Sequence, residues 1–316
     1  MSIKVTTQRQ ALDFTAITIL AVLCLSWGVQ HVAIKVASSV VSPVMQCCIR
    51  SIGATLLVWA WMMIRRQPLL EKDGTLWWGI AVGALFSVEF ILIYWGLEYT
   101  NASRAVIFLY LCPFVIAIGV QLFIPSEKLR WAQVAGLCCA FTGIVVAFSE
   151  SLRLPSYRML IGDAMLAGAA VLWGAVTVMI KAGPLARINS TKTLLYQLAA
   201  SAIVLPLTVI AFDEPDIGRI TPLIFGLLFF QTVWIASITY IAWFWLVRYY
   251  PAARLASFTF LTPLLGVIAG GVLLHEPISS SLVIAVALVA IGIFLVNRPS
   301  PAPVKGATVE PSCRTE

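Results

Sequence analysis

The two halves of this 316-residue chain repeat one another, and this repeat limits the possible folds more than any other sequence feature. A first group recurs 146 positions later, as the pairs Trp27/Trp173, Gly28/Gly174, Val32/Val178, Ile34/Ile180 and Lys35/Lys181. A second group recurs 150 positions later, as Trp95/Trp245, Tyr99/Tyr249, Ala102/Ala252, Arg104/Arg254, Phe108/Phe258, Leu111/Leu261 and Pro113/Pro263. A third recurs 149 positions later, as Glu127/Glu276, Gly143/Gly292 and Ile144/Ile293. The nearly constant spacing predicts one helical unit built twice.

The composition predicts that this unit lies in lipid. Sixty per cent of the residues are hydrophobic, 11% are charged, and the mean hydropathy is +0.96. A soluble domain of this length could not bury so much apolar surface. A membrane-spanning helix needs about 20 mostly apolar residues. This rule predicts an all-α membrane protein with ten transmembrane helices, at 14–36, 43–64, 75–97, 103–124, 130–149, 160–181, 191–211, 221–247, 252–273 and 280–297.

The ten spans divide into two five-helix repeats, at 14–149 and 160–297. Because five is an odd number, the second repeat enters the bilayer from the opposite side, so the repeats are inverted. Inverted repeats commonly place a substrate site between the halves, near the bilayer midplane. The remaining residues, 298–316, are rich in proline and lack an apolar period, which predicts a disordered cytoplasmic tail.

The distribution of basic residues predicts the orientation. With the N-terminus inside, 15 of the 21 Lys and Arg residues fall in cytoplasmic segments, so we expect both termini in the cytoplasm. The first apolar stretch is retained as a span, since no A-x-A-like cleavage site follows it. The net charge of +7 comes from scattered residues that form no stripe. Anionic lipid headgroups are therefore the expected electrostatic partner, and nucleic acid is not.

Polar and aromatic residues mark the first span of each repeat. Trp27, Gln30 and His31 share one helix face, since they stand at i, i+3 and i+4. Trp173 and Thr177 lie on the matching face of the sixth span. A polar face inside a membrane must meet protein or water. These faces predict an aromatic-lined substrate cavity, and tight helix packing through the neighbouring glycines is the alternative.

Two charged residues within spans are further candidates. Glu89 lies near the middle of the third span, where an acidic side chain costs roughly 2.5–3.5 kcal/mol. It could bind a substrate ammonium, carry a proton, or pair structurally with Arg50 or His31. Arg50 could snorkel to the outer headgroups or receive a substrate carboxylate. Their counterparts in the second repeat are uncharged, Thr239 for Glu89 and Gln197 for Arg50.

The eighth span is unusually aromatic. Trp234, Ser237 and Tyr240 are spaced by three, and Trp243 continues the series, so all four could form one inward stripe that contacts substrate. Lipid-facing bulk and an interfacial aromatic belt are the alternative.

Matched prolines and lysines occur in both halves. Pro113 and Pro263 fall inside the fourth and ninth spans, where each should kink its helix. Kinks at matched positions would allow the two helices to bend as gates. The alternative is that each kink is fixed and serves only helix packing. Lys35 and Lys181 stand at helix ends, where we interpret them as interfacial anchors rather than ligands.

The sequence carries no pattern for an enzyme or an ATP-driven pump, since H-E-x-x-H, G-x-S-x-G, Walker A and G-x-G-x-x-G are absent. The seven cysteines include no CxxC pair and have no histidine at metal-ligand spacing. We therefore expect no catalytic site, no metal and no cofactor.

Taken together, these motifs resemble the drug/metabolite transporter superfamily, EamA-type branch. The resemblance rests on the Trp-Gly elements ending in Lys, the Arg and Pro of the fourth and ninth spans, and the Glu before a Gly-containing fifth and tenth span. It implies ten helices in two inverted EamA-like repeats, with helices 1, 3, 4, 6, 8 and 9 around a cavity and 5 and 10 outside it. It also implies that Trp27 and Trp173 line the cavity. Gate or scaffold roles are implied for Arg104, Arg254, Pro113, Pro263, Glu127 and Glu276.

More narrowly, the chain resembles bacterial aromatic amino-acid exporters. We therefore expect a monomeric secondary transporter of the inner (plasma) membrane that exports aromatic or neutral amino acids, or similar small metabolites, by alternating access. Zwitterions of this size need few charges in a site, and aromatic walls suit apolar side chains. A proton-coupled exporter of drug-like or other organic metabolites is one alternative. An intramembrane enzyme or a channel is an alternative of another class.

Overall fold

The computed structural model describes residues 11–68, 73–152, 155–211, 217–276 and 278–298. The described residues are mostly helical, with short connecting loops, and contain no strand. Its main helices are α1 (Phe14–Ala37), α2 (Pro43–Ile64), α3 (Leu76–Tyr99), α4 (Ala102–Leu109), α5 (Cys112–Phe123), α6 (Trp131–Ala147), α7 (Tyr157–Ala182), α8 (Ser190–Ala211), α9 (Pro222–Phe229), η4 (Phe230–Thr239), α10 (Tyr240–Tyr249), α11 (Ala252–Thr259), α12 (Leu261–Leu274) and α13 (Ser281–Asn297). Short 3₁₀ turns cover η1 (Pro125–Glu127), η2 (Ser149–Ser151) and η3 (Pro184–Arg187). The predicted tail, 298–316, lies outside the described residues except for Arg298.

Side-chain caps determine where several helices begin. A polar side chain accepts a hydrogen bond from a first-turn N–H at Asp13, Ser42, Asn101, Ser156 and Thr221. Such caps satisfy N–H groups that have no partner inside the helix. The helix ends agree well with the predicted ranges. The largest difference is at α7, which begins at Tyr157 instead of residue 160.

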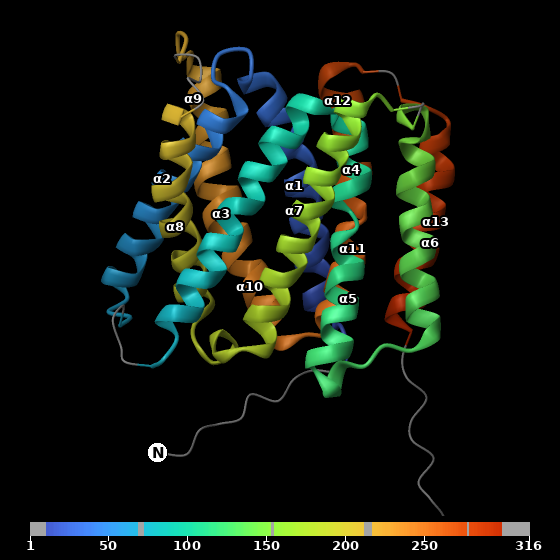
Figure 1. Cartoon of the computed structure of the whole chain (residues 1–316), viewed down its shortest axis with the longest axis horizontal. Coiled ribbons are helices and arrows are strands. Elements are labelled where there is room, and N and C mark those ends of the chain that lie inside the picture. The colour runs from blue at the N-terminus through green and yellow to red at the C-terminus, as the bar shows by residue number, and fades with distance from the viewer. Residues whose placement is uncertain (1–10, 69–72, 153–154, 212–216, 277, 299–316) are drawn as a thin grey trace, which may run out of the picture.

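Eight helical segments are long and apolar enough to cross a membrane, judged by length and composition. The other two, α6 and α13, are apolar but have only 17 residues each. They are shorter than the predicted spans at 130–149 and 280–297. Figure 1 shows α6 and α13 side by side at one edge of the bundle. The two helices approach closely because Gly136 and Gly292 face each other, and a Cβ on Gly292 would lie 2.5 Å from the Gly136 carbonyl oxygen.

Two predicted spans are interrupted for one or two residues near their prolines, as the predicted kinks require. The fourth is divided into α4 and α5, and the ninth into α11 and α12. A proline cannot donate the hydrogen bond to the carbonyl four residues earlier. For Pro113 that carbonyl belongs to Leu109, the last residue of α4, and for Pro263 it belongs to Thr259, the last residue of α11. Each break therefore lies where its proline removes a helical hydrogen bond.

The eighth predicted span changes its winding. Between α9 and α10, the segment η4 is a π-helix, in which hydrogen bonds join residues i and i+5. This winding places more residues in each turn than the 3.6 of an α-helix, so faces predicted with the α-helical period do not continue through η4.

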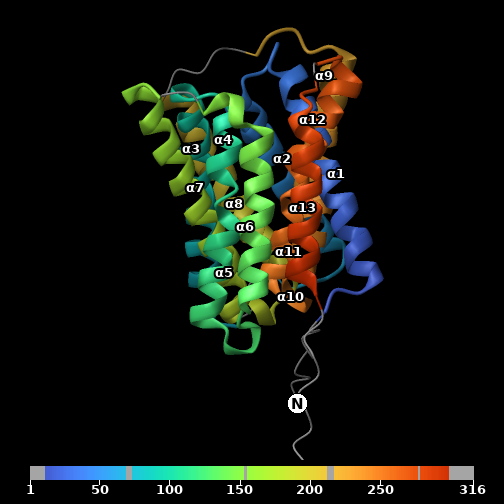
Figure 2. The same cartoon turned by 90° about the vertical axis from the view of Figure 1, so that its right-hand side faces the viewer.

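The two halves make matching contacts. Gly28 lies against α12, where an added Cβ would approach the Gly266 nitrogen to 2.9 Å. Its repeat partner Gly174 lies against α5, where an added Cβ would meet the Val115 side chain at 2.6 Å. Figures 1 and 2 also show that α1 begins and α13 ends at the same end of the bundle.

A second pair of matched contacts is made by hydroxyl groups. Each hydroxyl lies just before the fourth span of one repeat and contacts an aspartate near the start of the other repeat. The Thr100 hydroxyl donates to Asp163 Oδ1 at 3.0 Å. The Tyr250 hydroxyl, 150 positions later, lies 2.9 Å from Asp13 Oδ1. Asp13 and Asp163 are also 150 positions apart.

Candidate functional site

A central cavity of about 230 Å³ lies between helices of both halves. It is lined by Trp27, Gln30, His31, Ile34, Arg50, Phe86, Glu89, Phe90, Ile93, Tyr94, Leu109, Tyr110, Trp173, Val176, Thr177, Gln197, Tyr240, Trp243, Phe244, Thr259 and Thr262. This lining is mostly apolar and aromatic, with a small number of polar groups. Small-molecule sites commonly have this composition.

Eight of the ten residues predicted to contact substrate line this cavity: Trp27, Gln30, His31, Glu89, Trp173, Thr177, Tyr240 and Trp243. Tight packing by the neighbouring Gly28 and Gly174 occurs as well, and the cavity residue His31 lies on the same contact, since a Cβ added to Gly266 would lie 3.3 Å from His31 Cδ2. Both interpretations of these helices, cavity and packing, therefore apply.

Trp27 is held in an aromatic cluster. Its ring lies edge-on to those of Tyr240 and Trp243, with centroid distances of 6.4 and 5.6 Å. Its indole Nε1 donates to the Thr239 hydroxyl at 3.0 Å. Edge-to-face contacts and a satisfied N–H fix the ring orientation. These rings provide a pre-formed aromatic wall for the cavity.

Trp234 and Ser237 do not line the cavity, so the predicted stripe through residue 243 is wrong. The Trp234 ring is 38% exposed on the bundle surface, and its Nε1 donates to the Ser26 hydroxyl at 2.9 Å. The Ser237 hydroxyl donates to the carbonyl of Thr232, five residues earlier. Both residues lie in η4, where the wider winding separates them from Tyr240 and Trp243.

Glu89 lies in the cavity wall and is 5% exposed. Its Oε2 is buried and has no hydrogen-bond partner. Among the described residues, neither Arg50 nor His31 forms an ion pair with it, so the predicted structural pair is not found in this conformation. An acid buried without a partner is costly. The side chain is therefore available to a molecule that enters the cavity.

Arg50 also lies in the wall and is 5% exposed. Within the described part of the chain, its guanidinium makes one hydrogen bond, a 3.1 Å contact to Cys47 Sγ. It also stacks over the Phe90 ring, 5.3 Å from the centroid. The guanidinium thus lies along the cavity and does not reach the protein surface.

Two polar residues of the site were missed by sequence reasoning. Gln197, on α8, is fully buried, and neither its amide oxygen nor its amide nitrogen has a partner. The Thr262 hydroxyl, at the start of α12, is buried and unpartnered as well. The single sequence signal for Gln197 was its place as the counterpart of Arg50. Because Arg50 and Gln197 line the cavity, the second and seventh spans contribute to it in addition to the six that the resemblance implied.

The two broken spans reach the cavity at their breaks. Tyr110 lies between α4 and α5, and Thr259 and Thr262 flank the break between α11 and α12. Pro113 and Pro263 are themselves buried just beyond the breaks and do not line the cavity. A change in angle at either break would therefore change the cavity wall.

A buried ion pair lies beyond the cavity, at the end of the bundle where α1 begins. Lys181 Nζ is 2.9 Å from Glu127 Oε1, and the side chains are 1% and 5% exposed. The ammonium also donates to the backbone carbonyls of Val247, at 2.8 Å, and Tyr250. Glu127 Oε2 accepts from the Ala252 N–H at 2.9 Å, at the start of α11. The interpretation of Lys181 as an interfacial anchor is therefore wrong.

The repeat-related pair lies at the opposite end. Lys35 forms an ion pair with Glu276, and these side chains are 66% and 40% exposed. The two Lys–Glu pairs thus differ in burial.

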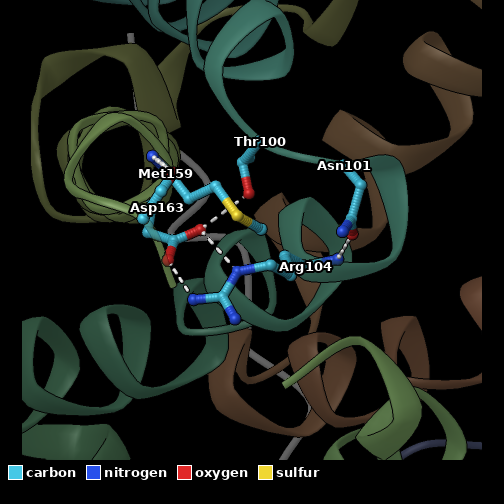
Figure 3. Close-up of polar contacts among 6 residues, drawn as sticks. Thr100, Asn101, Arg104, Met159 and Asp163 are labelled. Carbon is cyan, nitrogen blue, oxygen red and sulfur yellow. Dashed lines mark hydrogen bonds and ion pairs between the residues drawn. The ribbon is translucent and has the colours of Figure 1, made fainter. Parts of the chain in front are cut away.

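Arg104 joins the two repeats through Asp163. Figure 3 shows the guanidinium against the Asp163 carboxylate, with Nε 3.2 Å from Oδ1 and a second contact to Oδ2. Thr100 donates to the same carboxylate, and Asn101 caps α4 by accepting from the Arg104 N–H. Both charged side chains are almost fully buried. The junction thus ties the start of α4 to α7.

Several curated relatives are described as transporters or efflux pumps. The chain is 28% identical to the uncharacterized transporter YvbV of Bacillus subtilis (strain 168), with 90% of this chain and 92% of YvbV covered. It is 23% identical to the probable amino-acid metabolite efflux pump of Escherichia coli (strain K12), with 85% and 90% covered. Protein PagO of Salmonella typhimurium is 29% identical over a shorter region, 38% of this chain and 40% of PagO.

A crystal structure of a protein 22% identical to this chain has the same fold, with a TM-score of 0.75 and 89% and 98% of the two chains covered. The EamA-like transporter family matches residues 14–149 and 160–298, which is nearly all of the described chain. The predicted resemblance to the EamA-type branch is confirmed, and a non-enzymatic transporter is supported at the level of the family. Its repeated helical units, its central cavity and its relatives agree: the chain belongs to the EamA-like transporter family, of the drug/metabolite transporter superfamily.

Proposed function

We propose that the protein is a secondary transporter that exports amino acids, aromatic or neutral, or similar small metabolites by alternating access. In this proposal the ten apolar segments form ten spans in two inverted repeats. The protein works as a monomer in the bacterial inner membrane with both termini in the cytoplasm. The relative described as an amino-acid metabolite efflux pump supports the cargo class.

The observation that carries the proposal is the central cavity. Residues from both halves line it, including Trp27 and Glu89 from the first and Trp173 and Tyr240 from the second. A site shared by two halves can be exposed to either membrane face when the halves rock against each other.

The cavity volume favours a small metabolite over a drug-like molecule. Pockets for drug-sized ligands typically enclose about 300–1,000 Å³. The volume here, about 230 Å³, lies below that range. Aromatic rings beside a few polar groups suit a small molecule with an apolar side chain.

The repeat-related contacts support alternating access. The packing glycines, Gly28 and Gly174, and the helix breaks before Pro113 and Pro263 occur once in each half, and each glycine contacts a helix of the other half. The Lys–Glu pairs lie at opposite ends of the bundle and differ in burial. In the proposed cycle, the burial of the two pairs is exchanged as one end of the cavity closes and the other opens.

Uptake of radiolabelled amino acids into proteoliposomes tests the proposal. We expect saturable uptake of phenylalanine that falls at least tenfold in Trp27→Ala and in Glu89→Gln. Matched controls are Trp131→Ala, a residue 87% exposed on α6, and Glu98→Gln, an exposed residue on α3. Absence of amino-acid uptake by the wild type, or equal kinetics in all four variants, would contradict the proposal.

Proton coupling is a second candidate feature, favoured by the unpartnered Glu89 carboxylate and by His31 in the same cavity. A proton-coupled exporter of drug-like or other organic metabolites would accelerate when a pH gradient is imposed across the vesicle membrane. Glu89→Gln should abolish this acceleration. Transport that is independent of the gradient indicates facilitated movement instead.

A further inference from the structure

We propose that Arg50, Gln197 and Glu89 form a clamp that selects molecules carrying a carboxylate and an ammonium group on one carbon atom. The inference rests on the proposed transport function and defines its selectivity. Arg50 receives the carboxylate, Glu89 receives the ammonium, and Gln197 contacts both.

The three residues come from three neighbouring helices. Arg50 lies on α2, Gln197 on α8 and Glu89 on α3, and all three line the central cavity. Helix α8 packs against both α2 and α3, and Figure 1 shows it between them. The amide thus comes from the helix that lies between those carrying the two charges.

Each of the three side chains has unused hydrogen-bonding capacity. Guanidinium has five N–H donors, and within the described chain that of Arg50 contacts a single weak sulfur acceptor. The Glu89 Oε2 and both amide atoms of Gln197 are buried without partners. Buried polar groups are normally hydrogen-bonded. This group of orphaned atoms indicates that a polar ligand completes the site.

The chemistry of the orphaned atoms defines that ligand. A guanidinium pairs with a carboxylate through two parallel hydrogen bonds. A carboxylate accepts from an ammonium, and an amide can donate to a carboxylate while accepting from an ammonium. A zwitterion therefore compensates both charges of the cavity. A molecule with one charge leaves Arg50 or Glu89 buried without a counter-charge, which is unfavourable.

The aromatic wall adjoins the clamp and receives the rest of the ligand. Tyr240 lines the same cavity as Arg50 and Glu89. The Trp27 ring contacts the rings of both Tyr240 and Trp243, so the three rings form one continuous wall. The apolar part of a free α-amino acid would pack here.

The first experiment compares phenylalanine with two analogues in wild-type protein. Phenethylamine lacks the carboxylate and 3-phenylpropionate lacks the ammonium. Binding is measured by competition with radiolabelled phenylalanine in detergent, and transport by uptake into proteoliposomes. We expect each analogue to compete at least tenfold more weakly than unlabelled phenylalanine. Equal competition by either analogue would overturn the clamp while leaving amino-acid transport intact. Absence of phenylalanine binding and transport would instead overturn the proposed function.

The second experiment assigns each end of the clamp. Arg50→Gln should weaken phenylalanine binding at least tenfold and leave phenethylamine binding almost unchanged. Glu89→Gln should weaken phenylalanine binding similarly and leave 3-phenylpropionate binding almost unchanged. Arg65→Gln, at the exposed end of α2, and Glu98→Gln, on α3, are matched controls that should behave as wild type. Loss of binding for all three compounds to the same extent in a folded variant would contradict the assignment. If a variant does not fold, the competition by the two analogues in wild-type protein still tests whether the site requires both a carboxylate and an ammonium group.

Discussion

Lys181 Nζ lies 2.9 Å from Glu127 Oε1, and both side chains are almost completely buried. Their repeat counterparts, Lys35 and Glu276, form a second ion pair between the two halves, and this pair is largely exposed. One sequence motif therefore gives two electrostatically different contacts, one at each end of the bundle.

This difference predicts unequal effects of the same substitution. Lys181→Met leaves the Glu127 carboxylate buried without its counter-charge, and breaking a buried pair in this way costs about 3–5 kcal/mol. Lys35→Met removes an exposed pair, which contributes about 0–1 kcal/mol. Equilibrium unfolding in mixed micelles of mild detergent and SDS measures the loss of stability in each variant. Equal losses in the two variants would show that the difference in burial has no energetic consequence.

A single added methyl group should disrupt the α6–α13 contact. A Cβ on Gly292 would lie 2.5 Å from the Gly136 carbonyl oxygen and 2.6 Å from the Ala140 nitrogen. Because backbone atoms cannot move aside cheaply, Gly292→Ala should destabilise by about 1–3 kcal/mol. Gly226→Ala is the control, since an added Cβ there meets no atom within 4 Å. If Gly292→Ala were as stable as the wild type, the close α6–α13 contact would make no contribution to stability.

The positions of the helices could be predicted because membrane spans are long apolar runs that are independent of tertiary contacts. The interruptions of two spans could also be predicted, because a proline marks the helical hydrogen bond that is lost. Pro113 and Pro263 thus gave the positions of both interruptions.

The site was predicted in part for similar reasons. Trp27, His31 and Glu89 are conspicuous because polar or aromatic groups within an apolar span need an explanation. Gln197 and Thr262 are less conspicuous, and their place in the cavity depends on helix rotation and packing. Trp234 was misplaced because a period of three assumes α-helical winding, whereas η4 is a π-helix.

The broken spans predict a transport phenotype. Pro113→Ala restores a donor for the Leu109 carbonyl and should join α4 to α5, since an interior proline costs a helix about 3 kcal/mol. A stiffer span should reduce the transport rate several-fold without changing the affinity for phenylalanine. Pro206→Ala is the matched control, because Pro206 lies inside α8 without breaking it. A normal transport rate in Pro113→Ala would exclude bending at this break from the cycle.

The loop before α3 predicts a pH effect on stability. The Lys192 ammonium, 2.6 Å from Asp73 Oδ2, and hydrogen bonds from Thr75 hold the pKa of the Asp73 carboxyl well below its usual range. Since the folded pKa lies below the unfolded value of about 3.9, the contact stabilises the protein above that pH and is lost as the pH falls towards the folded pKa. Asp73→Asn should therefore lower the melting temperature at pH 7, and the difference from wild type should shrink below about pH 4. A difference that is constant with pH would show that the charge of Asp73 is not involved.

Access to the cavity from both membrane faces is the most direct test of the central claim. Ile93 lines the cavity without belonging to the proposed clamp, so Ile93→Cys in a background lacking the seven native cysteines reports on access. A membrane-impermeant thiol reagent is applied to right-side-out and to inverted vesicles, with Phe294→Cys, on the exposed surface of α13, as the control. The account predicts that Ile93→Cys reacts from both faces and that phenylalanine slows both reactions, whereas Phe294→Cys shows no such protection. Reaction from one face alone, or rates unaffected by phenylalanine, would contradict it.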